Sequence, residues 1–195
     1  MQLRLWIVLL SLLVAGLVSS GVVAYFIDSA QNANDSFATA ASWSEPALLD
    51  DGFEGDPWDA NWDDNGNTSW GLEDTQVHSG LWAARATTTE KGPLTTDDLD
   101  VASAHWIRVT FWYRADNLEA GDLIVLRYNG STYDTWYDIL SYSSYQPNTW
   151  CYFNEYITDS QYFKSNFRLR FEAYNDETGD NFYLDDVNII MLTVP

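Results

Sequence analysis

The chain has 195 residues, 16% of them aromatic, and a formal net charge of −20 at pH 7. This aromatic content argues against a disordered acidic tail, because such tails lack the apolar side chains that a folded core requires. The charge argues against a nucleic-acid partner, since phosphate binding needs clustered basic residues and the two lysines, Lys91 and Lys164, are isolated. The single cysteine, Cys151, excludes an internal disulfide and a zinc site built from cysteines.

The N-terminal segment is apolar. Residues 5–27 follow Arg4 and carry no charge, which predicts a hydrophobic helix long enough to cross a membrane. The small residues that end at Ala24 predict a signal peptide over residues 1–24, cleaved after Ala24. The alternative is an uncleaved anchor formed by residues 5–27, the one part that would then contact the membrane. Both alternatives predict that the remainder is secreted or displayed at the cell surface.

Residues 25–47 form the next predicted unit, an exported N-terminal segment and linker. The step from Ala24 to Asp28, Ala-Tyr-Phe-Ile-Asp, is followed by Asn34 to Ala40, and together they resemble the export region of the TasA and camelysin group. That resemblance implies processing by a SipW-type signal peptidase and export from the cell. Ser42 to Pro46 then has the composition of a short linker.

From residue 48 onward, short alternating segments are separated by Gly, Asn, Asp and Pro turns, and no long stretch shows helical periodicity. Alternation with a period of two places one set of side chains in a core and the other in water. Four segments show it clearly, namely 107–114, 123–128, 167–172 and 182–184. The sequence therefore predicts an all-β domain over residues 48–195, a two-sheet antiparallel β-sandwich preceded by one N-terminal hydrophobic helix.

Short motifs near both ends of this domain match a known group of folds. Gly-Phe-Glu-Gly at 52–55 opens it, Trp58 and Trp62 follow, His-Ser-Gly at 78–80 comes next, and Leu-Asp-Asp-Val at 184–187 closes it. In this order the motifs resemble the jelly-roll β-sandwiches of the MAM-like, concanavalin A-like and carbohydrate-binding-module kind. The resemblance spans residues 48–192.

The same resemblance implies a structural calcium ion. In carbohydrate-binding relatives the opening Glu and the closing Asp hold calcium between the first and last strands, and these positions correspond here to Glu54 and Asp185. Asp186 or Asp51 is the candidate third ligand. Carboxylate oxygens are ligands that calcium prefers in proteins. The alternative is that these carboxylates cap turns and solvate a sheet edge.

Sugar binding requires aromatic rings that stack on pyranose faces and planar polar groups that hydrogen-bond to hydroxyls. Such residues are expected at outward positions of neighbouring strands and in the Tyr-rich stretch that begins at Tyr133. Arg127 is among those expected to point outward. The candidate glycan-binding residues are Trp112, Arg114, Arg127, Trp136, Tyr137, Arg168 and Arg170. The alternative is that these side chains cover the outer sheet or pair with the many acids.

No catalytic constellation is evident in the sequence. The Glu-x-Asp-x-x-Glu pattern of jelly-roll glycosidases and the Gly-x-Ser-x-Gly nucleophile motif are both absent. Cys151 lies in a hydrophobic run beside Trp150 and Tyr152, which predicts a buried structural thiol rather than a nucleophile. The chain is therefore predicted not to be an enzyme.

Two functions follow from these predictions. The first is an exported, calcium-stabilised binding module of lectin-like fold, with a glycan or another cell-surface polymer as ligand. The alternative is a structural subunit of an extracellular filament, biofilm matrix or cell envelope, which self-associates by adding residues 25–41 as a strand to a neighbouring sheet. Three Asn-x-Ser sequons, at Asn34, Asn67 and Asn129, would accept glycans in a cell that has the machinery.

Overall fold

The computed structural model describes residues 45–55, 61–63, 70–86, 92–175, 177 and 179–193. All of these residues belong to the unit Thr39–Pro195. Over these ranges the chain forms eleven strands and two short 3-10 helices. The predicted hydrophobic helix, the cleavage site and the strand-adding segment 25–41 lie outside the described residues and stay predictions. Within the described ranges, no helix has the length and hydropathy needed to span a bilayer.

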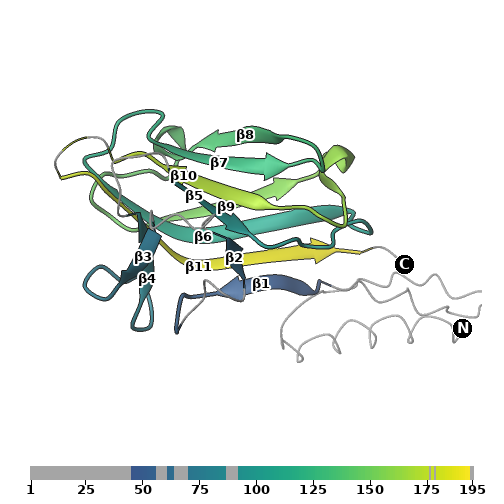
Figure 1. The fold of residues 1–195 in the computed structure, drawn as a ribbon, viewed down its shortest axis with the longest axis horizontal. Helices are drawn as coiled ribbons and strands as arrows, with labels where there is room; N and C mark the ends of the chain where they lie inside the picture. The colour runs from purple at the N-terminus through teal and green to yellow at the C-terminus, as the bar shows by residue number, and fades with distance from the viewer. Residues whose placement is uncertain are drawn as a thin grey trace, which may run out of the picture. The chain divides into compact units, whose positions relative to one another are not determined.

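The strands form two antiparallel sheets, one above the other (Figure 1). The first, named the β11 sheet, has the order β3-β4-β11-β6-β9, with β1 also paired to β11; the second, named the β10 sheet, has the order β2-β5-β10-β7-β8. The strand bounds are β1 Ala47–Asp51, β2 Trp62–Asp63, β3 Trp70–Glu73, β4 Ala83–Ala86, β5 Gly92–Thr96, β6 Trp106–Asp116, β7 Leu123–Tyr128, β8 Tyr133–Asp138, β9 Cys151–Ile157, β10 Leu169–Ala173 and β11 Asn181–Leu192; the 3-10 helices are η1 Ile139–Ser141 and η2 Ser160–Tyr162. The predicted all-β, two-sheet antiparallel sandwich is confirmed.

Strand β6 shows why the sequence folds in this way. Val109, Phe111 and Tyr113 are fully buried, whereas Arg108 and Trp112 are partly exposed on the opposite face. Residues 186–190 of the neighbouring β11 alternate in the same way, so here the pair presents one apolar face to the other sheet and one mixed face to solvent.

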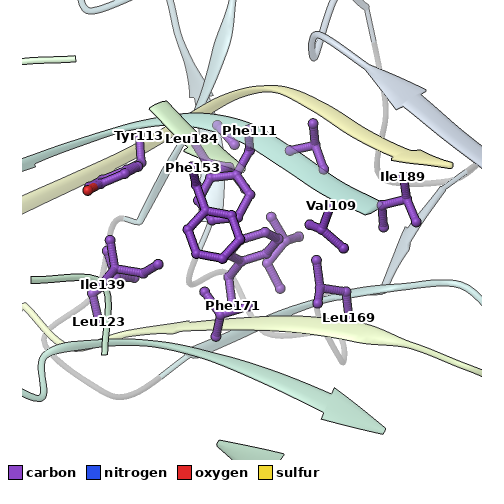
Figure 2. Packing of buried hydrophobic residues seen from close by; sticks show 14 of the residues in the cluster. Val109, Phe111, Tyr113, Leu123, Ile139, Phe153, Leu169, Phe171, Leu184 and Ile189 are labelled. Carbon is purple, nitrogen blue, oxygen red and sulfur yellow. The ribbon is translucent and has the colours of Figure 1, made fainter. Parts of the chain in front are cut away.

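The centre of the core is an aromatic contact that joins both sheets (Figure 2). Phe111 of β6 stacks on Phe153 of β9, with ring centroids 4.4 Å apart, and meets the edge of Phe171 of β10 at 5.0 Å. Burying each such side chain stabilises the fold by about 1.5–3 kcal/mol. Cys151 belongs to the same cluster as a buried free thiol, as predicted.

A bulge interrupts the pairing of β11 with β6 between Asp185 and Asn188. There Asp186 adopts a φ of 49°, which costs a non-glycine residue about 1 kcal/mol or more. The bulge lies beside Asp51↔Val187, the last pair of the ladder between β1 and β11. The first and last strands thus bring together the acidic motifs from the two ends of the domain.

Candidate functional site

Carboxylates and one loop meet at the bulge in β11, and we name this group the acid cluster; it consists of Glu54, Asp185, Asp186 and residues 78–82. Asp185 is fully buried. Its Oδ2 accepts hydrogen bonds from the backbone N–H groups of His78, at 2.9 Å, and Ser79, at 3.1 Å. Its Oδ1 accepts another from the N–H of Asp186, at 2.8 Å. The buried carboxylate therefore fixes the loop to the last strand.

Asp186 holds the same loop through side-chain contacts. Its Oδ2 lies 2.7 Å from His78 Nδ1, and its Oδ1 accepts a 2.7 Å hydrogen bond from the Ser79 hydroxyl. The imidazole of His78 stacks in turn on Trp112 of β6, with ring centroids 3.9 Å apart. The loop is thus bound both to the bulge and to the outer side of the β11 sheet.

Glu54 reaches the loop from the opening motif. Its Oε1 accepts hydrogen bonds from the backbone N–H groups of residues 81 and 82, at 2.7 and 3.1 Å. Gly80 has a φ of 66°, and a Cβ atom there would overlap Glu54 Oε1, so glycine is what leaves room for this contact. A Cβ atom on Gly52 would lie 3.4 Å from Asp186 Oδ1 and 4.0 Å from Glu54 Cγ, so both acids flank this position.

The acid cluster places a second carboxylate beside a buried one. Burial raises the pKa of Asp185 from 3.8 to about 6, the loop N–H groups oppose this rise, and the negative charge of Asp186 adds to it. One ligand atom each from His78, Asp185 and Asp186 lies within 4.8 Å of the others. The donor atoms are mainly carboxylate oxygens, which suit a hard cation such as calcium.

Asp51 is engaged elsewhere. Its Oδ1 accepts a 2.7 Å hydrogen bond from the N–H of Phe53, and its Oδ2 accepts bonds from Trp62 Nε1, at 2.9 Å, and Asn61 Nδ2, at 3.1 Å. Both oxygens therefore hold the chain that follows β1. Of the two candidate third ligands, Asp186 is the one that lies beside Asp185.

A second group of polar and aromatic side chains lies on the outer side of the β10 sheet, and we name it the Tyr133 face. Its members are Thr95, Tyr128, Tyr133, Arg168, Arg170 and Glu172. Arg170 and Glu172 alternate with buried residues of β10, so they point away from the core. The guanidinium of Arg170 lies 3.7 Å from the centroid of the Tyr133 ring, and its Nε donates a 3.0 Å hydrogen bond to Thr95 Oγ1.

Arg168 and Tyr128 extend the Tyr133 face. The Tyr128 and Tyr133 rings lie 4.9 Å apart. Arg168 is paired with Asp98, whose hydrogen bond raises the pKa of the guanidinium, and Arg170 Nη1 lies 3.6 Å from Glu172 Oε1. Because the Arg170 guanidinium covers one face of the Tyr133 ring, a pyranose could stack on this arginine or on the neighbouring Tyr128 ring, with its hydroxyls hydrogen-bonded by guanidinium N–H groups.

Arg127 does not belong to this face, and the expectation that it points outward is wrong. It pairs with the buried Leu169, and its guanidinium lies 4.0 Å from the centroid of the Tyr162 ring. The reason is that Leu126, an apolar residue, takes an outward position on β7, so the apolar pattern of this strand does not reveal which side faces the core.

Trp136 and Tyr137 pack against the core rather than on an outer surface. Their rings lie 5.5 and 5.2 Å from that of the fully buried Phe153. The pairing of β7 with β8 is irregular at this point, and Trp136 has no partner in the register. This irregularity lets both adjacent rings contact the core, which strict alternation would not allow.

Trp112 and Arg114 lie on the other side of the sandwich. Both belong to β6 in the β11 sheet, whereas Arg168 and Arg170 lie on the β10 sheet. Arg114 Nε donates a 2.9 Å hydrogen bond to Asp116 Oδ1. The predicted single face of aromatic and arginine side chains is therefore not formed, because strand pairing divides the candidates between two opposite surfaces.

Three members of the Tyr133 face, Thr95, Tyr128 and Glu172, were not identified from the sequence. For Glu172 a signal is present, since it continues the alternation of Arg168 and Arg170. Thr95 and Tyr128 come from β5 and β7, and no local pattern shows that these strands flank β10.

Solved structures of carbohydrate-binding modules resemble this sandwich. The CBM22-1 xylan-binding domain of Paenibacillus barcinonensis Xyn10C matches with a TM-score of 0.54 and 17% identity, over 80% of this chain and 99% of that one. The chain shares the fold of a xylan-binding domain. The CBM22-1-CBM22-2 tandem domain of the same protein matches with a TM-score of 0.51 and 19% identity, over 80% of this chain and 49% of that one. No protein-family model and no curated protein sequence matches the chain.

Proposed function

We propose that this chain is an exported, non-catalytic module that binds a glycan through the Tyr133 face. The observation that carries the proposal is the Arg170 guanidinium 3.7 Å above the Tyr133 ring, with a second ring, Tyr128, 4.9 Å from Tyr133. The fold shared with a xylan-binding domain supports it. Glycans of a matrix or cell surface would be the ligands.

The Tyr133 face is suited to this role because its polar groups are already oriented. Each arginine is held by a carboxylate, Arg168 by Asp98 and Arg170 by Glu172. Holding these side chains in place before the ligand arrives lowers the entropy lost on binding. The guanidinium N–H groups that point away from the carboxylates would donate to sugar hydroxyls.

Affinity electrophoresis of the full chain in gels containing xylan, mixed-linkage β-glucan, galactan or mannan tests the glycan proposal. We expect at least one polymer to retard the protein, and Tyr133→Ala or Arg170→Gln to weaken binding about tenfold. Tyr133→Phe keeps the ring and should bind nearly as well as the wild type.

The matched control is Arg85→Gln. Arg85 lies on the β11 sheet, paired with Glu73 at 3.2 Å, so its loss should leave retention unchanged. Retention that neither Tyr133→Ala nor Arg170→Gln weakens would refute the assignment of the Tyr133 face.

The proposal includes a structural calcium ion in the acid cluster. Glu54, Asp185 and Asp186 would supply carboxylate oxygens, and the cation would tie the opening motif to the last strand. A ligand that binds only the folded state raises stability by mass action, by about 2.7 kcal/mol at a hundred times its Kd. The residues present thus fit a cation whose role is stability rather than chemistry.

Thermal unfolding with calcium and with a chelator tests this site. We expect calcium to raise the Tm of the wild type by several degrees, an order of magnitude set by that free energy. Asp185→Asn and Glu54→Gln should remove the difference, whereas Asp100→Asn, which changes an acid outside the cluster, should retain it. An equal calcium response in all four proteins would refute the site.

A further inference from the structure

The outer side of the β11 sheet carries a line of side chains that the proposed function does not use. We name it the Tyr156 strip; its members are Arg108 and Trp112 of β6 and Tyr152, Asn154 and Tyr156 of β9. Tyr152, Asn154 and Tyr156 pair with alternate residues of β6 on the face opposite the buried Val109 and Phe111, so their side chains point away from the core. The strip thus lies on the opposite side of the sandwich from the Tyr133 face.

Two exposed tyrosines mark the ends of the strip. Tyr152 is 38% and Tyr156 48% exposed, and Leu81 is the other large apolar side chain that the described ranges leave this exposed. The Tyr152 ring lies 5.0 Å from Trp112, and the Tyr156 ring lies 5.2 Å from Trp106. Each exposed ring is therefore supported by a tryptophan on the neighbouring strand.

Polar groups occupy the space between the tyrosines. Arg108 Nε donates a 2.9 Å hydrogen bond to Asn154 Oδ1, and its guanidinium lies 5.8 Å from the centroid of the Tyr156 ring. Nothing in the part of the chain that the structure describes accepts a hydrogen bond from the terminal nitrogens of Arg108 or from Asn154 Nδ2. These N–H groups can donate to hydroxyl groups of a ligand.

The free edge of β9 is closed to another strand at the same place. The Ser144 hydroxyl donates a 2.8 Å hydrogen bond to the carbonyl of Tyr152. The Tyr142 hydroxyl, which lies 3.0 Å from Glu155 Oε1, covers the carbonyl of Asn154 at 3.3 Å. Because side chains cover these edge carbonyls, a second copy of the chain would gain little by pairing here. A ligand would instead use the side chains of the strip.

The charge of the strip and of the whole chain indicates whether the ligand is neutral or charged. Arg108 is the one charged member of the strip, and the chain as a whole carries a formal charge of −20. A polyanion would meet one guanidinium and the repulsion of the whole molecule. A neutral polymer rich in hydroxyls fits both the exposed rings and the unoccupied donors.

We propose that the Tyr156 strip is a second binding surface, which takes a neutral polysaccharide chain. Tyr152 and Tyr156 are four residues apart, about 13 Å along the strand. This distance exceeds the length of one pyranose ring, so the two tyrosines stack on different sugars of one chain. A molecule that also binds glycan through the Tyr133 face, which rests on the proposed function, would bridge two polysaccharide chains.

Affinity electrophoresis with the same four polymers separates the two surfaces. In a Tyr133→Ala background, we expect residual retention, and the further changes Tyr152→Ala and Tyr156→Ala should weaken it about tenfold. Both tyrosines are partly exposed, so their loss should lower the Tm only slightly and leave the protein folded. Leu81→Ala is the matched control, because it removes a 71% exposed apolar side chain outside the strip and keeps the backbone N–H that donates to Glu54, so retention should not change.

Each outcome decides between the surfaces. Retention that Tyr133→Ala alone abolishes would overturn the strip and leave the proposed function intact. Retention that depends only on Tyr152 and Tyr156 would support the strip and overturn the assignment of the Tyr133 face. No retention by any polymer would overturn both.

Turbidity of polysaccharide solutions tests the bridging. With two surfaces, we expect turbidity to rise as protein is added and to fall again at protein excess, when each chain is saturated. Variants that lack either surface should stay clear while still binding. Turbidity that persists after loss of one surface would overturn the bridging role.

Discussion

The acid cluster and the Tyr133 face both hold charged side chains, but in opposite ways. In the acid cluster, the fully buried Asp185 is bound by backbone N–H groups of a loop, beside a second carboxylate. On the Tyr133 face, Arg168 and Arg170 each lie beside a carboxylate and remain 38% and 21% exposed. Changes in the acid cluster should therefore alter the stability of the fold, and changes in the Tyr133 face should alter ligand binding.

The largest expected effect is the loss of stability in Gly80→Ala. The added methyl group would displace Glu54 Oε1, which accepts two backbone hydrogen bonds, and would sit at a φ of 66°, so the free energy of unfolding should fall by about 3 kcal/mol in urea titrations. Gly121→Ala is the control, because Gly121 also has a positive φ, 95°, but has no atom within 4 Å of an added Cβ. It should cost about 1 kcal/mol. Equal losses would show that the Glu54 contact contributes nothing.

The next effect is a pH dependence that originates in Asp185. Its pKa is 3.8 in the unfolded chain and about 6 in the fold, so between these values the folded state keeps a proton that the unfolded state releases. The free energy of unfolding should therefore fall as the pH rises from about 4 to about 6, by about 3 kcal/mol in all.

Urea unfolding with a chelator across this pH range measures that dependence. Asp185→Asn has no carboxyl group at this position, so its stability should not show this pH dependence. The wild type should therefore lose stability relative to the variant as the pH rises. Calcium should offset the loss, because it binds the ionised carboxylates. A wild type that gains stability relative to Asp185→Asn over the same range would contradict the buried carboxylate.

A smaller loss of stability is expected for Trp136→Ala, and it tests the placement of this ring in the core. Trp136 packs 5.5 Å from Phe153 and 5.3 Å from the Arg127 guanidinium. Its removal should lower the free energy of unfolding by about 2 kcal/mol and leave glycan retention unchanged. Lost retention without lost stability would identify Trp136 as a ligand contact after all.

The smallest change in stability is expected for Arg168→Gln. The ion pair of Arg168 with Asp98 is exposed, so the free energy of unfolding should change by less than about 1 kcal/mol. Glycan retention should still weaken by roughly fivefold, because a charged hydrogen-bond donor is lost. Thermal unfolding and affinity electrophoresis of the same preparation measure the change in stability and the change in glycan retention. Unchanged retention would limit the ligand surface to Arg170 and the tyrosines.

Strands were predictable from the sequence because their pattern is local. The alternation of Val109, Phe111 and Tyr113 specifies β6, and its buried face follows from residue type alone. The same reasoning failed for Arg127, since Leu126 places an apolar residue on each face of β7. It also failed for Trp136, because an irregular register is not visible in a single strand.

The two candidate sites were predictable to different degrees. Short motifs around Glu54, His78 and Asp185 indicated one acidic site near the ends of the domain, and the structure brings these motifs together. The Tyr133 face depends on the order β5-β10-β7-β8, which joins strands from distant parts of the sequence. Residue type can suggest such a face, but strand order decides which residues share it.

The ladder between β1 and β11 has a mechanical consequence. β1 begins at Ala47, opposite Ile190, and β11 ends at Leu192, so these two strand ends lie at the same end of the ladder (Figure 1). Tension applied at these two ends would separate β1 from β11 one pair at a time instead of shearing all pairs at once. The acid cluster lies beyond the opposite end of the ladder, past Asp51↔Val187. A cation bound there would hold the two strands together after the other pairs had separated. We therefore expect calcium to raise the force at which the domain unfolds when it is pulled through these two strand ends.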